Sequence, residues 1–181
     1  MTFPRARKGR LGYDIDEVED FLEDARRAYT AESPDVSVVT ADTIRTTAFT
    51  MRKGGYSATH VDAALERLED AFAARERERR IALEGDESWY ASARETAQEI
   101  LDRVVRPKGK KFQRVTVLTL GYSVADVDGF SDRIAGYFQS GEPLTPEDVR
   151  TVAFRPQRGG YREAQVDYLL DTVTRVMLAV R

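Results

Sequence analysis

The chain has no cysteine, a single histidine and no long apolar run. The absence of cysteine excludes disulfide frameworks, thiolate zinc sites, iron–sulfur clusters and thiol nucleophiles. One histidine, His60, excludes a His-rich metal site and weakens the case for a catalytic triad. No stretch approaches the roughly 18–20 apolar residues that a membrane-spanning helix needs. We therefore expect a cytoplasmic protein that holds no metal and no cofactor.

Motifs for catalysis and nucleotide binding are also lacking. Gly54-Gly55 and Gly159-Gly160 are not followed by the further glycines and the Lys-Ser/Thr pair of a phosphate-binding loop. The net charge of −3 is too close to neutral to favour nucleic acid as a ligand. These absences favour a non-enzymatic protein, and we expect no nucleic-acid partner.

What the sequence does contain is one short pattern, present four times. A Gly-Tyr pair is followed five residues after the Tyr by Val and then by an acidic residue. We number the copies one to four; they are Gly12-Tyr13…Val18-Glu19, Gly55-Tyr56…Val61-Asp62, Gly121-Tyr122…Val127-Asp128 and Gly160-Tyr161…Val166-Asp167. We interpret these residues as a structural signature, in which the Gly permits a backbone turn and the Tyr packs beside its own helix.

Each copy has a Phe before its Gly-Tyr pair, and the distance sorts the copies into two types. The Phe lies ten residues before the Tyr in copies one and three (Phe3 and Phe112), which we call type A. It lies seven residues before in copies two and four (Phe49 and Phe154), which we call type B. The order A-B-A-B indicates that a two-copy segment was duplicated.

Every copy is predicted to be a loop followed by a helix. Asp14, Ser57 and Ser123 are N-cap candidates, and Glu17 and Asp126 stand three residues on as capping-box partners. Apolar residues then recur at spacings of four, three and four, which is typical of a helix face that buries against another helix. In copy three this seam contains Ser131, so we expect the second half to be the weaker pair and the site of further association.

The predicted fold is all-α, without a sheet. It has four loop-plus-helix repeats in A-B-A-B order, short helices before copies two and four, and repeats paired as pseudo-symmetric helical hairpins or short coiled coils. The blocks beginning at Thr40 and Thr145 predict the short helices, since Thr145 is followed by Pro146 and by an acid three residues on. We expect three segments: residues 1–85 as the first A-B pair, 86–106 as a connecting helix and 107–181 as the second A-B pair.

The pattern Phe…Gly-Tyr…Val-acid resembles the DivIVA domain, and the chain resembles the actinobacterial proteins that repeat this domain. The resemblance is strongest from Arg106 to Asp128 and covers about three quarters of the chain. It implies a cytoplasmic scaffold in cell division or polar growth that dimerises through a coiled coil and gathers at the anionic inner membrane face. It also implies protein partners, among them DivIVA-like coiled-coil proteins, and a chain that is a monomer with internal pseudo-dimers or a homodimer.

In that family the tip of the loop before Gly-Tyr touches lipid. The corresponding pairs here are Arg10-Leu11, Lys53-Gly54, Thr119-Leu120 and Arg158-Gly159, of which only two contain an apolar residue. Basic residues also precede the first and third Gly-Tyr pairs, and near a membrane surface each contributes about 1 kcal/mol. The resulting candidates for membrane or anion contact are Arg7, Lys8, Arg10, Leu11, Lys108, Lys110, Lys111 and Leu120.

Two other functions remain open at this point. The repeats could form a protein-interaction platform that never meets a membrane. A short helix, a turn and a second helix also recur, as in helix-turn-helix DNA-binding regulators, although their turn has only three or four residues.

Overall fold

The computed structural model describes residues 3–30 and 39–180. It divides into two compact units, Met1–Arg79 and Arg80–Arg181. The first contains β1 (Leu11–Tyr13), α1 (Ile15–Thr30), α2 (Ala41–Thr46), β2 (Met51–Lys53) and most of α3 (Ala58–Glu84). The second contains the end of α3, then α4 (Asp86–Val104), β3 (Leu120–Tyr122), α5 (Val124–Ser140), α6 (Pro146–Thr151), β4 (Pro156–Arg158) and α7 (Glu163–Ala179).

The fold is mostly helical, as expected, but the prediction that it has no sheet is wrong. Each unit has a two-stranded antiparallel ribbon made from the Gly-Tyr segment of one copy and the end of the loop before the next Gly-Tyr pair. In the first ribbon Gly12 lies opposite Arg52, and in the second Gly121 lies opposite Gln157. Of the β-branched and apolar run 115–120, only Leu120 belongs to a ribbon. Strands of three residues carry no detectable period, so only pairing between distant segments reveals them.

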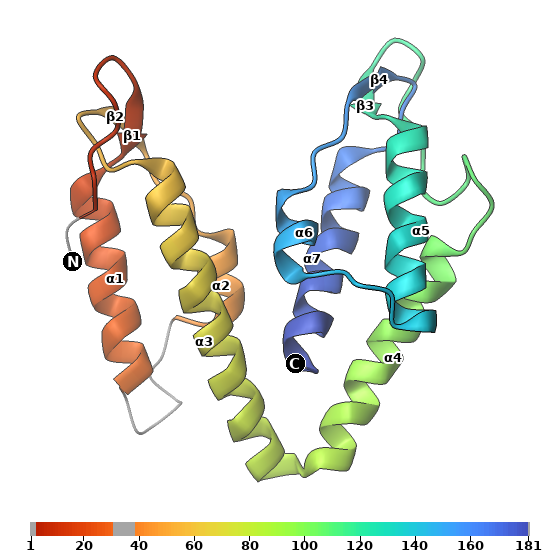
Figure 1. The fold of residues 1–181 in the computed structure, drawn as a ribbon, viewed down its shortest axis with the longest axis horizontal. Helices are drawn as coiled ribbons and strands as arrows, with labels where there is room; N and C mark the ends of the chain where they lie inside the picture. Colours follow the sequence, from red (N-terminus) through yellow and green to blue (C-terminus); the bar gives the residue numbers. More distant parts are fainter. Residues whose placement is uncertain (1–2, 31–38, 181) are drawn as a thin grey trace. The chain divides into compact units, whose positions relative to one another are not determined.

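The ribbon of the first unit lies at one end of a helix pair. Because β1 leads into α1 and β2 leads towards α3, both helices run away from the ribbon in the same direction (Figure 1). Val18 of α1 and Val61 of α3 are fully buried against Tyr56, with Leu22 and Leu65 beside them. A second cluster farther along the helices brings α2 against α1 and α3. Its buried members are Ala25 of α1, Val39 just before α2, Ala41 and Ile44 of α2, and Phe72 of α3.

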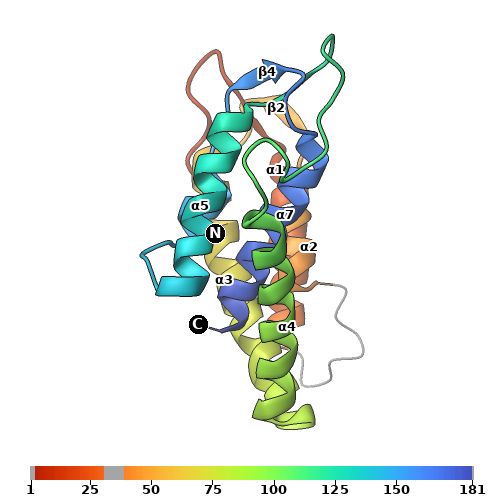
Figure 2. The same cartoon turned by 90° about the vertical axis from the view of Figure 1, so that its right-hand side faces the viewer.

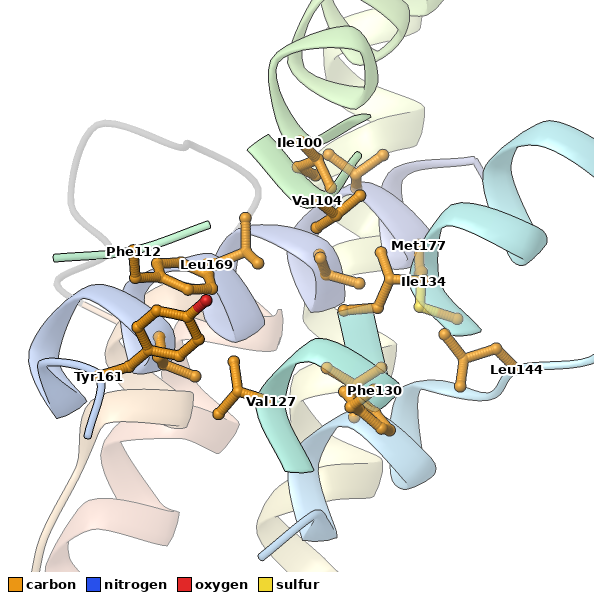
Figure 3. Close-up of a cluster of buried hydrophobic side chains, with 14 residues drawn as sticks. Ile100, Val104, Phe112, Val127, Phe130, Ile134, Leu144, Tyr161, Leu169 and Met177 are labelled. Carbon is orange, nitrogen blue, oxygen red and sulfur yellow. The ribbon is translucent and has the colours of Figure 1, made fainter. Parts of the chain in front are cut away.

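The second unit repeats this arrangement with α5 and α7 and adds α4. Ile100 and Val104 of α4 enter the same buried cluster as Val127 and Ile134 of α5 (Figure 3). Val173 of α7 belongs to this cluster as well. The segment expected to be a connecting helix therefore packs within the second unit, where α4 lies over α7 (Figure 2).

The direction of α4 follows from two contacts near its ends. The Trp89 indole N–H donates to the Ala179 carbonyl at 3.0 Å, near the end of α7. The Arg103 guanidinium lies 6.0 Å from the centre of the Phe112 ring, which packs on Tyr161 just before α7. Thus α4 runs antiparallel to α7.

Helix ends follow the predicted signals at most positions. Asp14 Oδ1 accepts the backbone N–H groups of Asp16 and Glu17, and Ser123 accepts that of Asp126. Thr145 and Asp148 form a reciprocal capping box at α6. These caps satisfy N–H groups that a helix cannot pair internally.

Candidate functional site

The Gly-Tyr pairs of each unit meet each other. The Tyr13 N–H donates to the Tyr56 carbonyl at 2.9 Å, and the Tyr56 N–H donates back at 2.8 Å. Tyr122 and Tyr161 form the same reciprocal bonds at 3.0 and 2.9 Å. The signature thus lies where an A copy and a B copy touch.

The glycines permit this contact rather than a turn, which corrects our interpretation of them. None of the four signature glycines has a positive φ. A Cβ on Gly12 would lie 2.2 Å from the Tyr56 carbonyl oxygen, and one on Gly55 would lie 2.3 Å from that of Tyr13. Gly121 and Gly160 are equally close to the partner tyrosine's oxygen, at 2.3 Å each. Only glycine allows the two backbones to approach this closely.

The aromatic rings also cross between copies, so the tyrosines do not simply pack beside their own helices. Phe3 packs edge-on against Tyr56 with ring centres 5.4 Å apart, and Phe49 packs against Tyr13 at 5.3 Å. In the second unit the ring centres of Phe112 and Tyr161 are 5.4 Å apart and those of Phe154 and Tyr122 are 5.3 Å apart. Figure 3 shows Phe112 beside Tyr161. Each Phe therefore packs against the Tyr of the other copy in its unit.

The acid of the signature binds the tyrosine hydroxyl of the other copy. Tyr56 donates to Glu19 at 2.5 Å, and Tyr161 donates to Asp128 at 2.9 Å. Burial and the Asp128 carboxylate raise the pKa of Tyr161 to about 12. Burial and a hydrogen bond to Asp62 likewise raise the pKa of Tyr13. The hydroxyls remain neutral donors far above physiological pH.

Glu17 and Asp126 also make hydrogen bonds from one copy to the other. We expected them to return to their own N-caps, but Glu17 accepts the Thr50 N–H at 2.7 Å and Asp126 accepts the Arg155 N–H at 3.2 Å. Thr50 and Arg155 directly follow the Phe of the other copy. Arg155 also pairs its side chain with Asp126 at 2.5 Å, and this hydrogen bond lowers the pKa of Asp126 to about 2.

Copies two and four carry His60 and Gln165 at the position equivalent to Glu17. Gln165 accepts the Gln113 N–H at 2.9 Å, where Gln113 follows Phe112. The residue after Phe3 is Pro4, which has no N–H to donate. His60 bonds instead to Ser57 at 3.0 Å, in the first turn of its own helix.

The signature residues are therefore occupied in holding the two copies together, and the available surface lies in the loops beside the ribbons. In the first unit Arg7, Lys8, Arg10 and Leu11 occupy one exposed tip. A turn closes it, with the Arg10 N–H donating to the Arg7 carbonyl at 2.9 Å.

Arg5 is not part of this tip surface. It donates to the Gly54 carbonyl at 3.0 Å and stacks 5.2 Å above the Tyr56 ring. Its equivalent in copy three, Arg114, donates to the Gly159 carbonyl at 2.7 Å. Both arginines tie the A loop to the B loop of their unit.

The second unit has the same turn with different chemistry at its tip. The Thr119 N–H donates to the Thr116 carbonyl at 2.9 Å, and the two residues between are Val117 and Leu118. Their exposed fractions are 78% and 84%, and Leu120 beside them is 58% exposed. Sequence reasoning missed Val117 and Leu118 because it considered only the two residues before Gly-Tyr. Aligning copies one and three would have placed them opposite Lys8 and Gly9.

The three candidate lysines of the second unit lie apart from this tip, in the loop that follows α4 and packs along α5. Lys110 is exposed, and Lys108 approaches Asp132 at 3.4 Å. Lys111 is buried: its ammonium donates to the Val104 carbonyl and to Asp132 at 2.9 Å. Its hydrogen bond lowers the pKa of Asp132. Lys111 therefore stabilises the end of α4 and is not available to a membrane or a free anion.

A shallow groove of about 440 Å³ lies between α4 and α7. Ile100, Phe112 and Leu169 contribute apolar surface, and Arg103 and Tyr168 contribute polar atoms. Within the described residues no three His, Asp or Glu side chains gather closely enough to hold a metal ion.

Residues 3–30 and 39–180 include no helix with the length and apolar character needed to cross a bilayer. Comparisons of the chain with family models, with curated proteins and with solved structures give no match.

Proposed function

We propose that this chain is a non-enzymatic, DivIVA-like scaffold that acts in cell division or polar growth. Its loop tips contact the anionic cytoplasmic face of the membrane, and its helices bind other proteins. The repeated signature resembles that of the DivIVA domain. The observation that favours membrane contact is the exposed Val117-Leu118 tip.

That tip supports membrane contact because it presents two apolar side chains at the end of a closed turn. Transfer of a Val or Leu side chain from water to an apolar phase contributes about 1.5–3 kcal/mol each. Arg158, which lies opposite Leu120 in the ribbon, is exposed beside it. One such tip gives weak, reversible binding, so additional contacts are required.

The first unit supplies the complementary chemistry. Arg7, Lys8 and Arg10 are exposed, and the described part of the chain gives none of these side chains an ion-pair partner. Three cations near an anionic surface contribute about 3 kcal/mol together, and salt weakens this attraction. Leu11, half exposed in the ribbon beside them, adds apolar surface.

Co-sedimentation with vesicles tests the proposal. The full chain should bind vesicles rich in phosphatidylglycerol and should bind neutral phosphatidylcholine vesicles far less. Replacing Val117 and Leu118 together by Ser should reduce binding at least tenfold, and replacing Leu11 and Leu120 should reduce it less. Leu83→Ser is the matched control, since Leu83 is 79% exposed but lies at the end of α3. Membrane contact is ruled out if the wild-type chain does not bind anionic vesicles, or if the variant with Val117 and Leu118 replaced binds them as well as wild type.

A protein-interaction platform without membrane contact is the second candidate, favoured by the groove between α4 and α7. Tyr168 at its edge is 69% exposed, which suits an aromatic anchor at an interface. In the vesicle assay this candidate predicts no binding to lipid of either charge. The helix-turn-helix alternative gains no support, because α2 and α3 are joined through β2 rather than by a short turn.

A further inference from the structure

The two units differ in how well one face of their helix pairs is covered. In the second unit α4 covers a face of α5 and α7, and the residues there are buried: Ser131, Leu169, Val173 and Val176. We expected the seam with Ser131 to be the site of further association, but α4 already covers it. The residues at the same positions of the first unit are only half-buried: Leu22, Ala64, Leu68 and Ala71. The first unit has no helix equivalent to α4 among its described residues.

The opposite face provides an internal control. There α2 and α6 cover equivalent positions, and three pairs of equivalent residues are buried in both units. Ala25 matches Ile134, Ile44 matches Val149 and Phe72 matches Met177, and each of these residues is at most 5% exposed. These three pairs do not differ between the units, whereas the residues on the face that α4 covers do; we call that face the open face of the first unit.

The charges that flank the open face favour the same face of a second copy of this chain as its binding partner. On α1 the flank carries Glu19 and Glu23, and the equivalent of Glu23 in the second unit is Asp132, which binds Lys111 beside α4. On α3 the flank carries His60 and Arg67, and the equivalents of these two line the groove beside α4. Arg26, three residues beyond Glu23 on α1, adds a positive charge to the first flank, and Glu19 accepts the Tyr56 hydroxyl. The complementarity of the face to itself therefore depends on Glu23 on one flank and Arg67 on the other.

Glu23 and Arg67 also lie at similar heights along their helices. Tyr13 and Tyr56 are paired, so residues equally far beyond them lie at similar heights on the parallel helices α1 and α3. Glu23 is ten residues beyond Tyr13, and Arg67 is eleven beyond Tyr56. A twofold axis parallel to the helices would place α1 of one copy over α3 of the other and bring Glu23 to Arg67 twice.

We propose that two copies of this chain associate through the open faces of their first units, as a parallel, twofold-symmetric arrangement of α1 and α3. Leu22, Ala64, Leu68 and Ala71 supply the apolar contact, and the small alanines let the helices approach closely. The Glu23–Arg67 pairs set register and direction, which is the usual contribution of charges at an interface. This association is independent of lipid contact by the tips.

Sedimentation equilibrium of the full chain over about 1–500 µM tests the association, because weak dimers dissociate in this range. We expect a reversible monomer–dimer equilibrium. Ala64→Arg with Ala71→Arg should weaken it at least tenfold, whereas the control Ala82→Arg, at an exposed position farther along α3, should not. Circular dichroism spectra and melting curves should show that all variants remain folded.

Charge reversal tests the register. Glu23→Arg alone and Arg67→Glu alone should each be monomeric, since each places like charges together twice. Mixed in equal amounts, the two variants should form a heterodimer, because the arginine introduced in one variant then meets the glutamate introduced in the other. A wild-type chain that stays monomeric over the whole range overturns the proposal, as does a mixture of the two variants that remains monomeric.

Discussion

The Tyr161 hydroxyl donates a hydrogen bond of 2.9 Å to Oδ1 of Asp128, although 33 residues separate the two along the chain. Asp128 is buried, and its Oδ2 accepts the Gly109 N–H at 2.7 Å. One carboxylate thus joins copy three, copy four and the loop after α4.

Tyr161→Phe should destabilise the second unit by about 1–3 kcal/mol, because it leaves one buried oxygen of Asp128 without its donor. Urea unfolding followed by the fluorescence of Trp89, the single tryptophan, measures this unit. Tyr168→Phe is the control, since that ring is 69% exposed. Equal midpoints for the two variants would contradict a structural role for the bond.

The stability of the second unit should fall at high pH. An unfolded tyrosine titrates near 10, whereas the pKa of Tyr161 is raised to about 12 in the folded unit. Between these values the folded state retains a proton that the unfolded state has lost, so the stabilisation is complete below pH 10 and is lost as the pH approaches 12. Urea midpoints taken from pH 9 to pH 12 should show this decline, and Tyr161→Phe should show a smaller one.

Gly121→Ala should destabilise the second unit by about 2–4 kcal/mol, because the new Cβ would lie 2.3 Å from the Tyr161 carbonyl oxygen. Gly129→Ala is the matched control within α5. Nothing lies within 4 Å of a Cβ there, so its better helix propensity should stabilise the unit by up to about 1 kcal/mol. Thermal melts that shift in the same direction for both would refute the close-approach explanation of the signature glycine.

Lys111→Met should cost about 1–3 kcal/mol, because the Val104 carbonyl loses a buried donor. Lys110→Met removes the same charge from an exposed position and should leave stability nearly unchanged. Calorimetric unfolding separates the two. If both variants unfold alike, Lys111 does not stabilise the end of α4.

Much of the local structure can be predicted from this sequence. Apolar spacings of four, three and four predict the long helices, and a helix is present within the expected segment 86–106, as α4. Asp14, Ser123 and Thr145 are confirmed as caps. These features depend on residues within one or two turns of each other, so the local sequence is sufficient to specify them.

Only the tertiary structure shows what the signature does. The pattern marks Gly12 and Tyr13 as special, yet their partners Tyr56 and Phe49 belong to another copy, and no local rule connects them. The ribbons, the hydrogen bonds between copies and the burial of Lys111 likewise depend on contacts between distant segments. Each arises where segments separated by tens of residues come together, and the free energy of that contact depends on packing and desolvation that no short window of sequence contains.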